Sequence, residues 1–514
     1  MEGLAIPVAP PAALAIDTSA PGAKGVKADC LGYASNVVIA VASTAPAYSL
    51  ATTLGFITVI GGVGLHAPGI LILAFLPMLC VSLGYRYLNL ADPDCGTTFA
   101  WTTRALGPQL GWLNGWAIFL ADVIVMASLA DIASIYTFKL VGWTAASNSN
   151  LAQIIGSVVW IALMTWICYR GIELSARLQL VLLTLEVAVL GLFAVVALVK
   201  VYGGSFHNSV HPALSWFNPF VGWGPLSSAL LLAIFIYWGW DSGVAVNEES
   251  RDPAQGPGKA AVLSTVLLLL IYVLVTVGAQ GVHGPGFLSS NSQDVLSPLG
   301  TAVFGNGILQ KLLIFCVLTS ASASTQTTIL PTARTTLSMA NWGAIPRVAG
   351  RIHANYQTPS VSTLGMGLVS IIWTVGLLAL DPGGSVLGDS ITALGFAVCF
   401  YYGFTGVACV VYYRHELFKS MRRVLLVGLL PLLGAAGMFW IFYKAYVTDS
   451  GAGYNYSKPL LGIQIPIVIG IGGLLLGVVL MLLAWPGQRQ FFSRRPQTAD
   501  QAILDEHFAH EHAT

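Results

Sequence analysis

The sequence reads Tyr237-Trp238-Gly239-Trp240-Asp241-Ser242-Gly243 in the middle of an apolar stretch, from Pro225 to Val246, that is long enough to cross a bilayer. An aspartate at membrane depth costs several kcal/mol unless it is paired or hydrated, and the two glycines beside it weaken a helix. A membrane helix that breaks around polar groups is typical of transport proteins with a binding site at mid-membrane. This stretch therefore predicts a broken helix that carries such a site.

The whole chain is unusually apolar. Of its 514 residues, 56% are hydrophobic and only 9% are charged, and the mean hydropathy is +0.76, whereas about 25% of residues are charged in soluble domains. We therefore expect an integral membrane protein whose main solvent is the lipid bilayer. A net charge of +1 argues against a nucleic-acid partner, because too few basic groups are present to neutralise several phosphates.

The sequence lacks the short motifs that mark common catalytic sites. It has no H-E-x-x-H, no phosphate-binding P-loop and no G-x-S-x-G. We therefore expect neither an enzyme nor a pump driven by ATP, and we expect no cofactor and no resident metal.

Twelve apolar runs have roughly the length that a bilayer crossing requires. They lie at residues 36–60, 68–90, 109–138, 151–169, 178–202, 226–246, 260–281, 308–330, 358–380, 390–413, 424–446 and 460–485. An even number of crossings places both termini on one side. All but five of the 23 basic residues fall on that side, and the exceptions are Lys139, Lys200, Lys311, Lys444 and Lys458. The positive-inside rule then predicts cytoplasmic termini for a multi-pass protein of the plasma (inner) membrane.

The ends of the chain differ from its apolar middle. Residues 1–30 are rich in Ala and Pro and lack the pattern of a signal peptide, so we predict a disordered cytoplasmic tail. Residues 31–487 form the predicted twelve-helix transporter domain, and residues 488–514 form a predicted cytoplasmic C-terminal tail.

A second irregularity interrupts the first span, which reads Ser43-Thr44-Ala45-Pro46-Ala47-Tyr48-Ser49. Pro46 removes one backbone donor and blocks the carbonyl one turn back, so polar backbone groups become free to meet a ligand. Breaks in spans 1 and 6 are five helices apart, as expected for inverted repeats of helices 1–5 and 6–10, followed by helices 11–12. The sequence thus predicts an all-α integral membrane fold of this kind. An ordinary proline kink is the alternative reading of the first break.

Four segments carry motifs in a fixed order. They are Gly96-Thr97-Thr98-Phe99-Ala100-Trp101 with Arg104 and Gly107-Pro108, Arg170-Gly171-Ile172-Glu173, Tyr237-Trp238-Gly239-Trp240-Asp241 with Asn247-Glu248-Glu249 and Pro253, and Thr332-Ala333-Arg334 with Met339-Ala340 and Gly343-Ala344-Ile345-Pro346. Across roughly residues 30 to 490, they resemble the signatures of amino acid, polyamine and organocation (APC) permeases, of the amino acid permease type.

The resemblance implies a secondary active transporter of amino acids or related amines that works by alternating access, with protons as the expected coupling ion. One departure is Ser43-Thr44-Ala45-Pro46-Ala47, which stands where many members carry a glycine-rich element that binds a substrate carboxylate. Three alternatives therefore stay open: a polyamine or organocation permease, a sodium-coupled amino acid symporter, and a non-transporting amino acid sensor. Symport, exchange and uniport are not distinguished.

Both breaks supply groups for a substrate site. Backbone N–H groups at the start of the second half of helix 1 favour an anion such as a carboxylate. Free carbonyls before Asp241, together with its charge, favour an ammonium group. The predicted substrate-binding residues are Ser43, Thr44, Ala45, Tyr237, Trp238, Gly239, Trp240, Asp241 and Ser242. The alternative is that the small polar residues only join helices by hydrogen bonds.

Four acids lie inside apolar spans: Asp122, Asp131, Glu186 and Asp241. Burial without a cation favours the protonated form of a carboxyl group, so such residues can couple proton uptake to a conformational change. We expect Asp241, Glu186 and Asp122 to be the proton-coupling residues, although Glu186 could instead bond helix 1 or 8. Nine residues turn a helix by 180° past whole turns, so Asp122 and Asp131 face opposite ways. We expect Asp131 to bond a neighbouring helix.

The remaining candidates are hydroxyls and aromatic rings. Ser322 and Ser324 lie in the hydroxyl-rich run of helix 8 and would be the ligands of a coupling sodium ion, although close packing of small residues explains this run more simply. Trp238, Tyr401 and Tyr402 are candidates for gating or for stacking on the substrate, and packing is their alternative role.

Overall fold

The computed structural model describes residues 24–380, 385–451 and 457–499, and within these ranges the chain is almost entirely helical, with only isolated β-bridges. Twelve helices there are long and apolar enough to cross a membrane, which confirms the predicted number. Most begin and end within a few residues of the predicted runs. The eighth is longer and ends at Asn341, because polar residues beyond position 330, such as Thr332 and Ser338, are buried against other helices.

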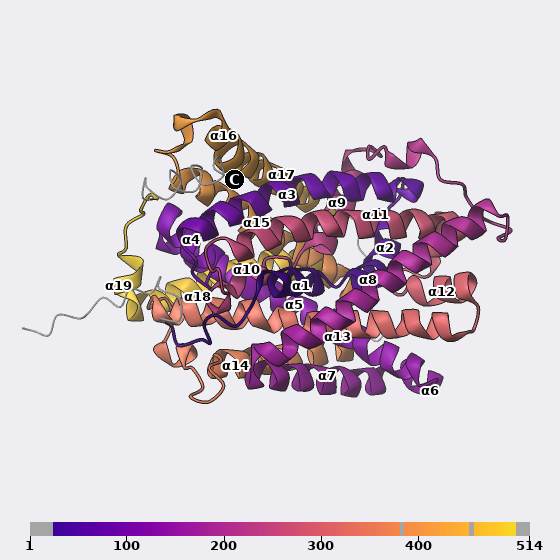
Figure 1. The fold of residues 1–514 in the computed structure, drawn as a ribbon, viewed down its shortest axis with the longest axis horizontal. Helices are drawn as coiled ribbons and strands as arrows, with labels where there is room; N and C mark the ends of the chain where they lie inside the picture. Colours follow the sequence, from indigo (N-terminus) through magenta and orange to yellow (C-terminus); the bar gives the residue numbers. More distant parts are fainter. Residues whose placement is uncertain (1–23, 381–384, 452–456, 500–514) are drawn as a thin grey trace, which may run out of the picture.

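The membrane-spanning helices run side by side in one bundle (Figure 1). They are α1 (Tyr33–Thr44) with α2 (Pro46–Val59), α3 (Ala67–Ala91), α5 (Pro108–Leu140), α7 (Asn150–Arg170), α8 (Ile172–Tyr202), α9 (Trp223–Tyr237) with α10 (Ser242–Ala245), α11 (Gly256–Ser290), α13 (Ile308–Asn341), α14 (Ser360–Leu380), α15 (Ser385–Tyr412), α17 (Leu430–Asp449) and α18 (Gly472–Ala484).

Short helices mark the two ends of the bundle. At one end lie α4 (Thr98–Leu106) and α19 (Arg489–Phe492), and at the other lie α6 (Thr144–Ser147) and α12 (Leu296–Phe304) (Figure 1). We call the first end the terminal face and the second the opposite face. The predicted tails lie largely outside the described residues, at 1–23 and 500–514. Lys24 and Val26, which were expected to belong to the N-terminal tail, are buried at the terminal face.

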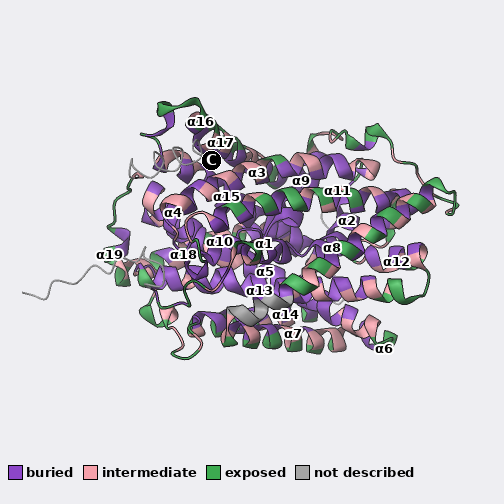
Figure 2. Ribbon diagram, viewed as in Figure 1, coloured by how far each residue is buried: buried purple, intermediate pink, exposed green. Residues whose placement is uncertain are grey.

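Burial decreases from the centre of the bundle outward, as Figure 2 shows. The span that contains α9 and α10 is completely buried, whereas only 17% of the last span is buried. The exposed side chains of the outer helices are apolar, for example Leu475 and Leu482 on α18 and Val159 on α7. This pattern suits a lipid-facing surface around a polar centre.

Both predicted helix breaks are present. The first span is interrupted at Ala45, which adopts a left-handed conformation with φ of 48° between α1 and α2. The sixth is interrupted from Trp238 to Asp241, where Trp238 is extended and Gly239 has φ of 118°. Each break separates two half-helices, and the two breaks are five spans apart. The first span is therefore broken at Ala45 and not merely kinked by Pro46.

Candidate functional site

The two broken helices touch each other at their breaks. A Cβ atom built on Gly239 would lie 2.9 Å from the carbonyl carbon and oxygen of Ser43, so only glycine permits this approach. The hydroxyl oxygens of Ser43 and Ser242 are 2.8 Å apart and share a hydrogen bond. A Cβ on Gly243 would lie 2.7 Å from the carbonyl oxygen of Asn36. The two breaks thus form one centre, the central site.

This approach makes Gly239→Ala a strongly destabilising substitution. The positive φ and the clash with Ser43 should together lower the free energy of unfolding by roughly 1–3 kcal/mol. The measurement is the thermal unfolding temperature of the purified protein, which should fall. Gly191→Ala is a matched control, because Gly191 lies in α8 with nothing within 4 Å of its added Cβ. Equal unfolding temperatures for the two variants would contradict the predicted clash.

The backbone N–H groups of Ala47 and Tyr48, at the start of α2, donate hydrogen bonds to side chains of other helices. Glu186 Oε1 accepts from the Ala47 N–H at 2.8 Å and from the Ser320 hydroxyl at 2.7 Å, and the Tyr48 N–H donates to Ser320 Oγ at 3.3 Å. A carboxylate at a helix N-terminus is favoured by the helix dipole. Glu186 therefore occupies the position predicted for a substrate carboxylate. Its hydrogen bonds link α8 to α2 and to α13.

Asp241 lies at the end of the second break against aromatic side chains. Tyr401 Oη donates to Asp241 Oδ2 at 3.1 Å, and Trp238 Nε1 donates to the same Tyr401 oxygen. Both aromatic residues were predicted as gating candidates, and both are in contact with the central site. The structure thus brings Ser43, Ser242, Trp238, Asp241 and Tyr401 together.

An aromatic cluster surrounds this position, made of Tyr85, Trp101, Trp240, Tyr401 and Tyr402. Trp240 stacks on Tyr402 with ring centroids 5.1 Å apart, and the Tyr85 ring meets Trp240 edge-on at 4.9 Å. Aromatic faces attract cations. Sequence reasoning missed Tyr85 and Trp101, because a single aromatic residue in an apolar span gives no sign of the partner that it meets.

The other predicted residues are placed less centrally. The Thr44 hydroxyl bonds Val41 O within its own helix, and the Tyr237 ring packs against Tyr272. Ser324 Oγ donates to the carbonyl oxygen of Ser43 at 2.7 Å, so one candidate sodium ligand reaches the first break. The other candidate, Ser322, bonds Leu318 O of its own helix.

The two acids of α5 lie in different surroundings. Asp122 accepts a hydrogen bond from the Thr332 hydroxyl of α13. Asp131 was expected to bond a neighbouring helix, and this expectation is wrong. Its Oδ1 is buried without a hydrogen-bond partner among the described residues, because the side chain borders a cavity rather than a helix.

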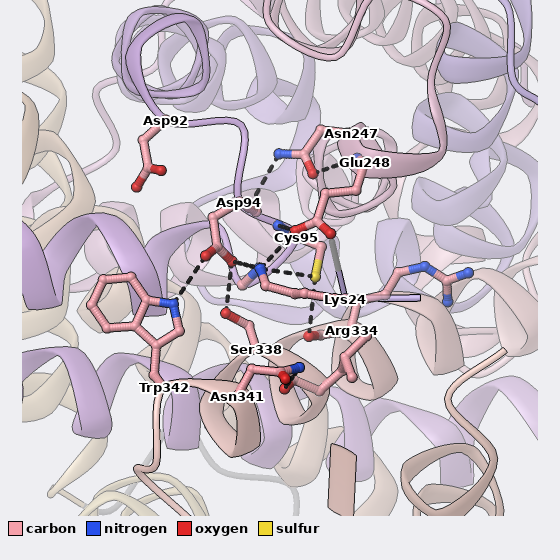
Figure 3. A network of polar contacts seen from close by, with 12 residues as sticks. Lys24, Asp92, Asp94, Cys95, Asn247, Glu248, Arg334, Ser338, Asn341 and Trp342 are labelled. Carbon is pink, nitrogen blue, oxygen red and sulfur yellow. Dashed lines mark hydrogen bonds and ion pairs between the residues drawn. The ribbon is translucent and has the colours of Figure 1, made fainter. Parts of the chain in front are cut away.

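A polar network that the sequence did not predict lies at the terminal face (Figure 3). Lys24 Nζ lies 2.7 Å from Asp94 Oδ1 and 2.6 Å from Glu248 Oε1, with all three side chains buried. Asp94 also accepts from Ser338 Oγ at 2.6 Å and from Trp342 Nε1 at 3.0 Å. The N-terminal segment thereby joins the loop before α4, the segment after α10 and the end of α13.

The charges of this network depend on one another. Burial disfavours a charged amine, but the carboxylates of Asp94 and Glu248 outweigh that cost and raise the pKa of Lys24 well above its usual value. Burial also opposes ionisation of Asp94, yet Lys24 lowers the pKa of this carboxyl group. At Asp92 burial prevails and raises the pKa to about 6, although Arg104 offsets part of the shift.

Three of the four sequence motifs meet in this network. Asp94 lies two residues before the first motif, Glu248 belongs to the third, and Ser338 and Trp342 lie between the ends of the fourth. The third and fourth motifs are also joined where Arg334 Nε and Glu249 Oε2 form an ion pair at 2.6 Å. The sequence signal was a set of acids at the ends of apolar spans with two lysines, Lys24 and Lys27, in the N-terminal segment, but the pairing needs the fold.

Known proteins resemble this chain over most of its length. The family model described as amino acid permease matches residues 31–487. The branched-chain amino acid permease BcaP of Lactococcus lactis is 23% identical over 73% of this chain and 82% of its own length. The low-affinity putrescine importer PlaP of Escherichia coli is also 23% identical, over 73% of this chain and 80% of its own. The methylthioribose transporter of Bacillus subtilis is similar to the same degree.

A solved structure shares the fold. The crystal structure of the Eremococcus coleocola manganese transporter, in complex with an aromatic bis-isothiourea substituted compound, superposes with a TM-score of 0.56 at 15% sequence identity. The alignment covers 89% of this chain and 95% of that one. The likeness supports the predicted architecture of inverted repeats with broken helices 1 and 6.

Proposed function

This chain belongs to the amino acid permease family of the APC superfamily, and from that membership we propose that it is a secondary active transporter of amino acids or related amines. It is a multi-pass membrane protein and not an enzyme. The observation that carries the proposal is the contact of the two broken helices at Gly239 and Ser43, beside the buried carboxylate of Asp241. Half-helices that meet around a charged group at mid-membrane are the usual substrate site of such transporters.

The charges of the central site favour an amine over an amino acid as the substrate. Asp241, Asp122 and Glu186 are buried acids, and none of the described hydrogen bonds or ion pairs joins them to Lys or Arg. An ammonium group would compensate Asp241 and lie against the aromatic cluster. A substrate carboxylate would have to displace Glu186 from the start of α2. This second observation favours amines that lack a carboxylate, which include the putrescine named for one relative.

We propose that the terminal face is cytoplasmic and that transport proceeds by alternating access in the plasma membrane. In this scheme the structure represents a state whose cytoplasmic side is closed by Lys24, Asp94 and Glu248. Opening that side requires the Lys24 ion pairs to separate, and Trp238 with Tyr401 gates the central site. Protons are the proposed coupling ion, with Asp241, Glu186 and Asp122 as the titrating groups.

Uptake into proteoliposomes tests the proposal. The purified protein is reconstituted and offered labelled putrescine and labelled leucine, each with an inward proton gradient, an inward sodium gradient or no gradient. We expect the proton gradient to accelerate uptake, the sodium gradient to leave it unchanged, and putrescine to be preferred. Preference for leucine would contradict the amine assignment but not the transport function. Measurable binding without uptake of either compound would indicate a sensor instead.

A further inference from the structure

A cavity of about 320 Å³ opens near the opposite face, away from the Lys24 network. Its walls come from α2, α5, α6, α7, α14 and α15 and from the segment before α12. Polar groups on the walls include Thr52, Ser128 and Gln153, and apolar groups include Ile132 and Ile135. The cavity is therefore lined by both polar and aliphatic side chains, as ligand sites for small organic molecules are.

Asp131 is one of two acids at the wall of this cavity, and the other is Asp294. Asp131 is only 6% exposed, and its Oδ1 atom is buried without a hydrogen-bond partner among the described residues. Burial of an unpaired carboxylate is costly, and a cation in the cavity would stabilise the ionised form of Asp131. The one basic residue among the lining residues is Lys139, and its amine is already paired with Asp294 and lies 5.2 Å from the Tyr136 ring centre.

Charge and size together indicate the class of ligand. Asp294 and Lys139 neutralise each other, so the lining carries a net negative charge from Asp131. Lys139 is eight residues along α5, about 12 Å from Asp131 by the helix rise, which is too far for an ion pair. A bare metal ion would leave most of the cavity empty, whereas an ammonium group on a short aliphatic stem would meet Asp131 and also cover Ile132 and Ile135.

The cavity is next to the central site but separate from it. Tyr48 Oη donates to Ser128 Oγ at 2.6 Å, and Ser128 lines the cavity. The backbone N–H of the same Tyr48 bonds Ser320, which holds Glu186. The buried Tyr48 side chain thus lies between the cavity and the first helix break.

We propose that this cavity is a second binding site, in which Asp131 with Ser128 binds the ammonium group of an organic amine. We propose further that the amine binds in this cavity before it reaches Asp241. That order of binding rests on the proposed transport function, whereas binding in the cavity does not. Movement of Tyr48 would connect the two sites.

Thiol labelling tests the charge preference of the cavity without any transport. Ile135→Cys places a thiol one helix turn from Asp131 on the same face. Its labelling rate is measured by mass spectrometry of the peptide with a cationic reagent, 2-aminoethyl methanethiosulfonate, and with uncharged methyl methanethiosulfonate. The ratio of the two rates cancels any effect of Asp131 on the fraction of thiolate. We expect Asp131→Asn in this background to lower the ratio about tenfold.

Two controls make the outcome decisive. Asp449→Asn removes another buried acid, on α17 and outside the cavity lining, and should leave the ratio unchanged. Asp131→Glu should restore it. Butylammonium should slow labelling of the cysteine when Asp131 is present, and butyrate should not. A ratio that does not change in Asp131→Asn, or equal protection by butylammonium in that variant, would overturn the proposal, whatever the uptake assay shows.

Discussion

Asp241→Asn should lower amine uptake by about two orders of magnitude and remove most of its pH dependence. The substitution keeps an oxygen that accepts the Tyr401 hydrogen bond, so the break in helix 6 should stay folded. It removes the charge that faces the aromatic cluster, and losing one partner of a buried charge pair costs about 2–5 kcal/mol. The measurement is the initial rate of putrescine uptake into proteoliposomes between pH 5 and pH 8.

Glu186→Gln is the matched control for Asp241→Asn. It also neutralises a buried acid, but the amide oxygen can still accept from the Ala47 N–H and the Ser320 hydroxyl. We expect it to keep the amine affinity and to change only the response to a proton gradient. If Asp241→Asn leaves both affinity and pH dependence as they are in the natural protein, Asp241 has no role in substrate binding or coupling.

Lys24→Met should destabilise the packing of the terminal face by about 3–5 kcal/mol, because it leaves Asp94 and Glu248 as buried carboxylates without a cation. Two changes should follow in the purified protein. The thermal unfolding temperature should fall, and Cys95, which is buried 3.7 Å from Lys24 Nζ, should react faster with a maleimide. Peptide mass spectrometry separates Cys95 from the other cysteines.

Lys27→Met is the control for this change, because Lys27 is exposed three residues further along the same segment. Lys27→Met should change neither the thermal unfolding temperature nor the reactivity of Cys95 by much. Lys24→Arg keeps the positive charge and should retain most of the protection of Cys95. If Lys24→Met leaves Cys95 as unreactive as Lys27→Met does, the N-terminal segment does not hold this face closed.

The sequence was sufficient for the architecture. Apolar runs must span the bilayer, since unpaired backbone groups are too costly there, and this requirement alone gives twelve helices. The polar interruptions at Pro46 and Asp241 identified both breaks, because Pro46 and Gly239 have conformational effects that do not depend on neighbours. Motif resemblance indicated the family. The apolar runs, the helix breaks and the motifs each depend on residues that are close together in the sequence, so the sequence alone reveals them.

The tertiary structure decided which side chains meet. Glu186 lies 139 residues from Ala47, and Lys24 lies 224 residues from Glu248, so neither pair has a signal at helical spacing. The opposite directions of Asp122 and Asp131 followed from the helix period, but only the packed bundle shows that Thr332 faces the first and a cavity faces the second. A helix period fixes the direction of a side chain relative to its own axis. What that side chain meets depends on the position of the neighbouring helices, which is a property of the whole fold.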